Sequence, residues 1–179
     1  MRTVITAAPI VEPVTLAEAK AQLRLDDDFT IDDDYISALI SVARDRCENY
    51  CNQFFTEQSI SLLYDVGFPT MVFLPYPNLT VTSITYTDEN NAAQTLDAGD
   101  YIFDSLNQTV TFKSDYTALN YQINATTSAP VQIVGVQHAI KMILTDLYEL
   151  RTETAVGVSL AENPAVKVLL YPYRLSLAI

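Results

Sequence analysis

A short helix is predicted by the stretch Pro13-Val14-Thr15-Leu16-Ala17-Glu18-Ala19-Lys20-Ala21-Gln22-Leu23. Thr15 followed by Glu18 is a capping box, in which each side chain accepts a hydrogen bond from the backbone N–H of the other residue. Leu16, Ala19 and Leu23 then recur at helical spacing. We therefore expect a helix from residue 15 to about residue 24.

A second helix is predicted after a run of acidic residues, since six Asp residues occur between Asp26 and Asp34. Asp is a poor residue inside a helix but a good one at its N-cap and in its first turn. The helix should begin at one of Asp32 to Asp34 and run to about Asn52. Its apolar stripe consists of Ile36, Leu39, Ile40, Ala43, Cys47 and Tyr50.

The period of the pattern changes between about Gln58 and Ala125. Short runs of β-branched and aromatic residues alternate there with Pro, Gly, Asn and Asp, which is typical of short antiparallel strands joined by turns. The predicted strands lie in the runs 59–64, 71–74, 81–86, 101–103, 109–112 and 121–123.

Helical spacing returns near Ile133 and continues to about Arg151. Asn163-Pro164 then places a capping residue before a Pro in the first turn of a further short helix, and Pro172 should end that helix. The predicted class is α+β: a small bundle of three to four helices with an inserted antiparallel β unit of five or six short strands and an apolar C-terminal tail. Residues 1–57 and 129–179 are expected to form the helical core, and residues 58–128 the inserted β domain.

Composition excludes several classes of function. The 179 residues carry a formal net charge of −12, so the Lys and Arg needed to bind nucleic-acid phosphates or an anionic membrane surface are scarce. The chain is nevertheless 49% hydrophobic, far above the level of a disordered acidic protein. Residues 129–179 are neutral and apolar, and oligomerisation is the simplest use for the extra apolar surface.

The sequence offers little material for catalysis and no motif for a cofactor. It lacks a Gly-x-Ser-x-Gly motif and a His-Glu-x-x-His motif, and it contains only four glycines. Cys47, Cys51 and the single histidine, His138, could form part of a zinc site, but two helical cysteines on one face are more often core residues. The Asp26–Asp34 run is either a solvated turn that caps the next helix or a weak cation site, because it resembles the start of a calcium loop without that loop's Gly and Glu. We predict no catalytic residue, metal or cofactor.

The C-terminal tail is the strongest candidate for partner binding. It is rich in Tyr, Arg and Leu, and Tyr and Arg are over-represented at interaction hot spots. An apolar tail either folds back onto its own bundle or docks on a partner. The predicted docking residues are Tyr171, Tyr173, Arg174, Leu175, Leu177 and Ile179.

Four pieces of the sequence, in order, resemble the head–tail connector proteins of tailed bacteriophages, also called adaptor or head-completion proteins. They are the segment from Glu12 to Asp26 with Asp33–Arg44, the β segment from Leu79 to Tyr101, the helix from Ala139 to Arg151, and the closing motif from Pro164 to Arg174. One departure is Ile133, where such proteins often carry Pro at the start of the third helix.

The resemblance implies a structural protein of the virion neck, assembled in the host cytoplasm and located at the capsid vertex. Such connectors form a ring, commonly a dodecamer, between the portal protein and a stopper or tail protein, and they extend the channel for DNA. Their C-terminal segment contacts the portal, and helices of neighbouring subunits pack side by side. The basic residues predicted at that subunit interface are Arg44, Arg46, Lys141 and Arg151.

The charge of the chain agrees with this expectation, because an acidic channel wall repels phosphate and lets DNA pass without specific binding. Two alternatives remain at this point. One is another neck or tail component, such as a stopper or tail terminator, and the other is a cation-binding or enzymatic domain.

Overall fold

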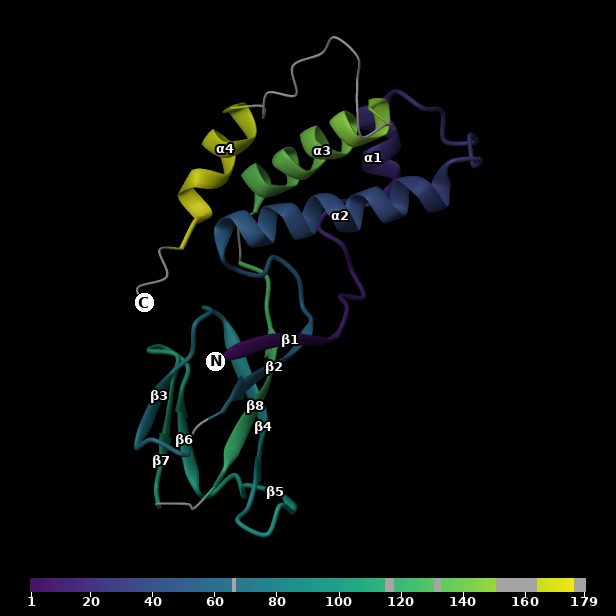
Figure 1. Cartoon of the computed structure of the whole chain (residues 1–179). Helices are drawn as coiled ribbons and strands as arrows, with labels where there is room; N and C mark the ends of the chain where they lie inside the picture. The colour runs from purple at the N-terminus through teal and green to yellow at the C-terminus, as the bar shows by residue number, and fades with distance from the viewer. Residues whose placement is uncertain (66, 115–117, 131–132, 151–163, 176–179) are drawn as a thin grey trace. The chain divides into compact units, whose positions relative to one another are not determined.

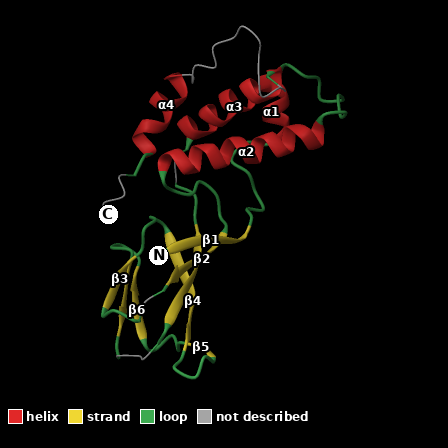
Figure 2. Ribbon diagram, in the orientation of Figure 1, coloured by secondary structure: helices red, strands yellow, loops and turns green. Residues whose placement is uncertain are grey.

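The computed structural model describes residues 1–65, 67–114, 118–130, 133–150 and 164–175 (Figure 1). The contacts divide the chain into two compact units. One unit joins Met1–Val11 to Thr56–Pro130 and contains strands, and the other joins Glu12–Phe55 to Val131–Ile179 and contains helices (Figure 2). The predicted α+β class is confirmed.

The helical unit contains four α-helices in the residues that the structure describes. Each lies where the sequence pattern predicts it, and a 3-10 turn, η1 (Tyr171–Tyr173), follows the last helix. The helices are α1 (Leu16–Leu23), α2 (Asp33–Cys51), α3 (Val134–Glu149) and α4 (Pro164–Leu170). None of these helices is both long enough and apolar enough to cross a bilayer.

The predicted capping box forms at the start of α1. Thr15 Oγ1 accepts a hydrogen bond from the backbone N–H of Glu18 at 3.2 Å, and Glu18 Oε2 accepts one from the N–H of Thr15 at 2.9 Å. Arg24 ends the helix in a left-handed conformation with a φ of 58°. These local bonds satisfy donors that a helix start would otherwise leave unpaired.

The core of the helical unit joins the apolar faces of its helices. The stripe of α2 is buried against that of α3, and Ala19 of α1 and Leu170 of α4 belong to the same cluster. Each large apolar side chain buried in this way stabilises the fold by about 2 kcal/mol. The stripe residues are Ile36, Leu39, Ile40, Ala43, Cys47 and Cys51 on α2, and Val136, Ala139, Ile140, Ile143 and Leu144 on α3.

The β unit contains two antiparallel sheets in its described residues. The five-stranded sheet has the order β1-β2-β8-β4-β5, and the three-stranded sheet has the order β3-β7-β6. The strands are β1 (Arg2–Ala7), β2 (Ser59–Tyr64), β3 (Met71–Phe73), β4 (Leu79–Thr87), β5 (Ala93–Thr95), β6 (Tyr101–Asp104), β7 (Thr109–Phe112) and β8 (Asn120–Thr127).

Alternation along the strands builds the core of the β unit. In the five-stranded sheet Leu62 and Ile84 both pair with Ile123, and all three side chains are fully buried. The ring of Tyr121 stacks on those of Tyr64 and Phe68, with centroids 4.6 and 4.7 Å apart. Burial raises the pKa of Tyr64 to about 12, so its hydroxyl stays protonated.

Two features differ from the sequence expectations. The pattern assigns residues 1–57 to the helical part, but Met1–Val11 groups with the β unit because β1 pairs with β2. Seven strands, rather than five or six, lie between residues 58 and 128 in the described residues. The additional strand β5 consists of Ala93-Gln94-Thr95, which has no apolar alternation to reveal it.

Candidate partner-binding surfaces

The C-terminal segment follows directly from α4 and η1. Pro172 lies within η1, where its missing N–H prevents an α-helix from continuing. The structure describes the predicted docking residues Tyr171, Tyr173, Arg174 and Leu175, whereas Leu177 and Ile179 lie outside the described residues.

The end of α2 holds this segment through three residues, Cys51, Asn52 and Gln53, which we call the C-terminal clasp. The N–H of Leu175 donates to the carbonyl oxygen of Cys51 at 2.8 Å, and Asn52 Nδ2 donates to the carbonyl oxygen of Leu175 at 3.1 Å. The amide of Gln53 donates to the carbonyl oxygen of Tyr173. A helix end leaves carbonyl groups without a helical partner, and Leu175 satisfies one of them.

Side chains add to the clasp. The half-buried ring of Tyr173 meets Phe55 edge-on, with centroids 6.1 Å apart and an interplanar angle of 87°. The guanidinium of Arg174 lies 5.2 Å from the ring centroid of Tyr50, as in a cation–π contact. Residues 173–175 are therefore folded back onto the chain's own bundle.

Tyr171 points the other way. Its side chain is 73% exposed, and Val168, one turn earlier on α4, is 72% exposed. The opposite face of the same short segment is buried, since Leu170 is a core residue. The helical unit thus presents an apolar outer face on α4 and η1, consisting of Val168 and Tyr171.

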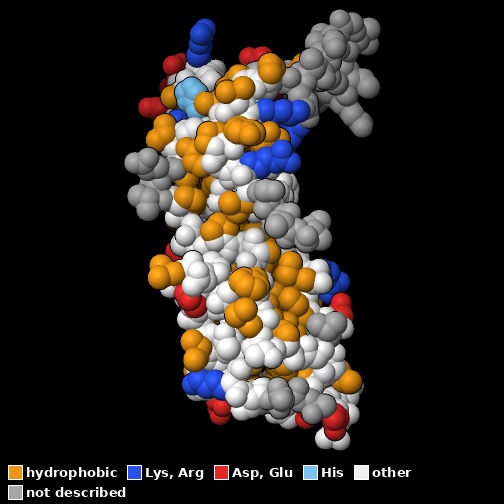
Figure 3. All heavy atoms as spheres, turned by 90° about the vertical axis from the view of Figure 1, so that its left-hand side faces the viewer, with side chains coloured by type: hydrophobic (Ala, Val, Ile, Leu, Met, Phe, Trp, Pro, Cys, Tyr) orange, Lys and Arg blue, Asp and Glu red, His pale blue; other side chains and the backbone are white. Residues whose placement is uncertain are grey.

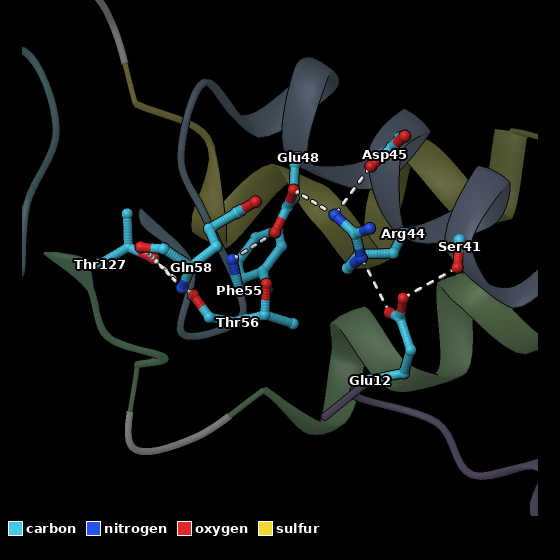
Figure 4. A network of polar contacts seen from close by, with 9 residues as sticks. All are labelled: Glu12, Ser41, Arg44, Asp45, Glu48, Phe55, Thr56, Gln58 and Thr127. Atoms are coloured by element: carbon cyan, nitrogen blue, oxygen red, sulfur yellow. Dashed lines mark hydrogen bonds and ion pairs between the residues drawn. The ribbon is translucent and has the colours of Figure 1, made fainter. Parts of the chain in front are cut away.

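Arg44, one of the four predicted interface residues, is instead the centre of a buried network within the subunit (Figure 4). Its Nε lies 2.8 Å from Glu12 Oε2, and its Nη1 lies 2.9 Å from Glu48 Oε2 and 2.7 Å from Asp45 Oδ1. Burial lowers the pKa of Arg44, but the hydrogen bond to Glu12 and the charges of the three acids more than offset this, so the net pKa is raised.

The network also fixes two chain segments. Glu48 Oε1 accepts a hydrogen bond from the backbone N–H of Phe55 at 2.8 Å, and Ser41 Oγ donates to Glu12 Oε1 at 2.9 Å (Figure 4). Arg44 thereby ties the segment before α1 and the segment after α2 to the middle of α2. This contact gives Arg44 a structural role in its own subunit.

The other three predicted interface residues differ in their surroundings. Arg46 is exposed on α2. Lys141 Nζ of α3 lies 3.3 Å from Glu18 Oε1 of α1, so its charge already has a partner in the chain. Arg151 lies outside the described residues.

Two residues of the acidic run between α1 and α2 form contacts with other helices. Lys20 Nζ lies 2.6 Å from Asp33 Oδ1, and the hydroxyl of Tyr148 donates to Asp32 Oδ2 at 2.6 Å. These contacts tie the start of α2 to α1 and to α3. They favour the interpretation of the run as an interhelical turn.

The cysteines are core residues. Burial raises the pKa of Cys47 to about 12 and that of Cys51 to about 11, so both thiols stay protonated inside the core. His138, in contrast, is exposed on α3. Among the residues with a described position, no three His, Cys, Asp or Glu side chains are grouped so that they could hold a metal ion.

Sequence reasoning missed the clasp and the carboxylate partners of Arg44. The residues that meet in the clasp are about 120 positions apart in the chain, and no local pattern links them. Asn52, which has a left-handed φ of 55°, is the one local signal, because Asn often ends a helix in this way.

Similarity to solved structures is extensive. The fold matches a chain of "Neck of empty GTA particle computed with C6 symmetry" with a TM-score of 0.76 and 18% identity, covering 100% of this chain and 98% of that chain. It matches a chain of "Virion of native gene transfer agent (GTA) particle" with a TM-score of 0.74 and 17% identity, with the same coverage. A third match, with a TM-score of 0.64, 16% identity and 98% coverage of both chains, is to "Neck of native GTA particle computed with C12 symmetry". At these identities the matches establish a common fold.

The sequence matches a protein family, although no curated protein is similar enough to count as a match. Residues 13–95, which include α1, α2 and strands β2 to β5, match the family described as "Phage gp6-like head-tail connector protein". The predicted resemblance is confirmed over these residues, where the sequence is similar to the phage gp6-like head–tail connector proteins.

Proposed function

We propose that this chain is a structural protein of a virion neck, where it forms a ring beneath the portal, joins head to tail and extends the channel for DNA. The family match over residues 13–95 is the observation that carries this proposal. The fold shared with chains of neck structures supports it. A connector family is a family of assembly proteins, so we expect no enzymatic activity.

The charge distribution supports the role of a channel wall. The formal charge of −12 is repeated in every copy of a ring, and a dodecamer multiplies it twelvefold. Such a wall repels DNA phosphates, so the genome can slide through it without being retained.

Portal docking is assigned to the C-terminal segment. Residues 173–175 are anchored by the C-terminal clasp, while Tyr171 keeps most of its side chain exposed beside Val168. The clasp lets the chain present the outer face of α4 and η1 in one conformation, which lowers the entropy cost of binding. The partner at this surface would be the portal, and a stopper or tail protein would bind elsewhere on the ring.

Binding to purified portal rings of the same particle tests this assignment. We expect Tyr171→Ser and removal of residues 176–179 each to weaken binding of the full chain at least about tenfold, as is usual for hot-spot residues. The matched control is Arg46→Ser, an exposed position on α2. If both variants bind the portal as well as the unchanged chain does, the C-terminal segment is not part of the docking surface. Particle images that place the chain outside the neck would contradict the proposed function itself.

A further inference from the structure

The first strand of the five-stranded sheet has an open edge. Strand β1 pairs only with β2 among the described strands, so the backbone groups on its other side have no strand partner. Its side chains are also exposed on both faces of the sheet, with Val4 39% and Ile5 50% exposed. Proteins normally protect such edges with Lys, Pro, inward charges or bulges. Thr3–Ala7 contains no Lys, Pro or charged residue, and its pairing with β2 is irregular only between Ile5 and Ala7.

The other sheet edges differ in how open they are. Strands β3 and β5 have three residues each, and Pro69 and Pro75, which cannot donate a backbone hydrogen bond, flank β3. Strand β6, in contrast, has four residues and pairs only with β7 among the described strands. Among the described edge strands other than β1, β6 is therefore the one best suited to receive a further strand.

The outer face of the three-stranded sheet is apolar. Ile102 of β6 is 56% exposed, and Met71 and Phe73 of β3 are 45% and 68% exposed. The pairing puts these residues on one face, because Ile102 and Met71 both pair with Thr111, and Phe73 pairs with Thr109. In Figure 3, hydrophobic side chains gather on the visible surface of the β unit.

In one antiparallel register between β1 and β6, residues of opposite charge face each other and apolar residues face each other. Placing Arg2 opposite Asp104 puts Val4 opposite Ile102. Arg2 and Val4 lie on one face of β1, since they pair with Leu63 and Ser61, and Ile102 and Asp104 lie on one face of β6. Cross-strand pairs of opposite charge and of apolar residues are those that stabilise a sheet.

We propose that β1 of one subunit pairs with β6 of a second copy of the same chain, with Arg2 opposite Asp104 and Val4 opposite Ile102. The complementary charges favour another copy as the occupant. Arg2 and Lys113 are the only basic residues in the β unit, against an acidic majority, so a contact between acidic copies is favoured where a cation of one meets an acid of the other.

Asp104 is suited to this pairing because it remains charged. The side chain and N–H of Asn107 and the N–H of Leu106 donate to its carboxylate, and these bonds lower its pKa. The contact joins two different edges of the subunit, so it repeats head to tail, and such heterologous contacts close into rings when the rotation allows. The inference thus rests on the proposed ring and names one contact between its subunits.

Disulfide trapping between two full-length chains tests the register. A tagged chain carrying Val4→Cys is mixed with an untagged chain carrying Ile102→Cys, under mild oxidation. We expect a crosslinked pair of tagged and untagged chains as the main product. The native cysteines should not interfere, because Cys47 and Cys51 are buried and protonated.

The matched control mixes Thr3→Cys with Ile102→Cys, because Thr3 lies on the opposite face of β1 and should give little product. Equal yield in this control, or crosslinking of Val4→Cys chains only to each other, would overturn the register. The charge is tested with Arg2→Glu, which should weaken self-association about fivefold, whereas Arg2→Lys should not. Asp104 is left unchanged because it holds the turn after β6.

The outcomes separate this contact from the proposed function. Rings that form without the crosslink would overturn the contact and leave the neck function standing. A crosslink without closed rings would support the contact and contradict ring assembly. A chain that stays monomeric and gives no crosslink would contradict both.

Discussion

Arg44 has surroundings that sequence alone does not reveal. Its charge and its place on a helix suggest a surface contact, yet only 6% of its side chain is exposed and it contacts three acids. A buried charge is favourable only when it is paired, so Arg44 and Glu48 depend on each other. The three carboxylates that pair with Arg44 all belong to its own chain.

We predict that Arg44→Ala lowers the free energy of unfolding by about 3 kcal/mol, because it leaves Glu48 buried without its cation. Urea denaturation measures this loss. The control is Arg46→Ala on the exposed side of the same helix, which should change stability by less than about 0.5 kcal/mol. Equal effects at the two positions would show that the network contributes little to stability.

The capping box of α1 gives a second prediction at this scale. Thr15→Ala should lower the free energy of unfolding by about 1 kcal/mol, because the N–H of Glu18 loses its acceptor. The hydrogen bonds from Thr15, followed by Lys141, lower the pKa of Glu18 in the folded chain from its ordinary value of 4.5.

A lowered folded-state pKa fixes the direction of the pH dependence. The contribution of Glu18 is complete above its unfolded-state pKa and is lost as the pH falls through its folded-state pKa. The stability difference between the wild-type chain and Glu18→Gln should therefore shrink below pH 4.5. A difference that stays constant down to the acid transition would contradict this role.

At the scale of elements, Gly135 lets α3 approach the C-terminal segment. A Cβ at this position would lie 3.0 Å from Tyr173 Cε2 and 3.3 Å from the carbonyl oxygen of Leu169. We predict that Gly135→Ala costs about 1–2 kcal/mol and loosens the clasp. Faster backbone amide exchange at Leu175 would report the loosening. Gly99→Ala is the control, because a Cβ there has no neighbour within 4 Å.

The elements differ in how well sequence could predict them. The helices carry their own signals, such as the Thr15–Glu18 capping box and the Pro at the start of α4, so their positions follow from local chemistry. Strand β1 was missed although Thr3-Val4-Ile5-Thr6 is entirely β-branched, because a single exposed run gives no alternation between core and solvent. The clasp requires residues far apart in the chain to meet, and only the tertiary structure brings Asn52 to Leu175.

At the scale of the whole molecule, the charge of −12 should govern assembly. Copies with this charge repel one another, and raising the salt from about 10 mM to about 100 mM shortens the Debye length from about 30 Å to about 10 Å. We predict that self-association strengthens over this range, because screening weakens the repulsion between whole subunits. Salt also weakens the attraction within the proposed Arg2–Asp104 pair. This is one ion pair, however, and its loss is smaller than the loss of repulsion between the net charges of two subunits. Sedimentation velocity across the salt series, with Arg2→Lys as the matched variant, measures the balance between repulsion of whole subunits and attraction within ion pairs. Association that weakens as the salt concentration rises would mean that attractive ion pairs dominate the assembly.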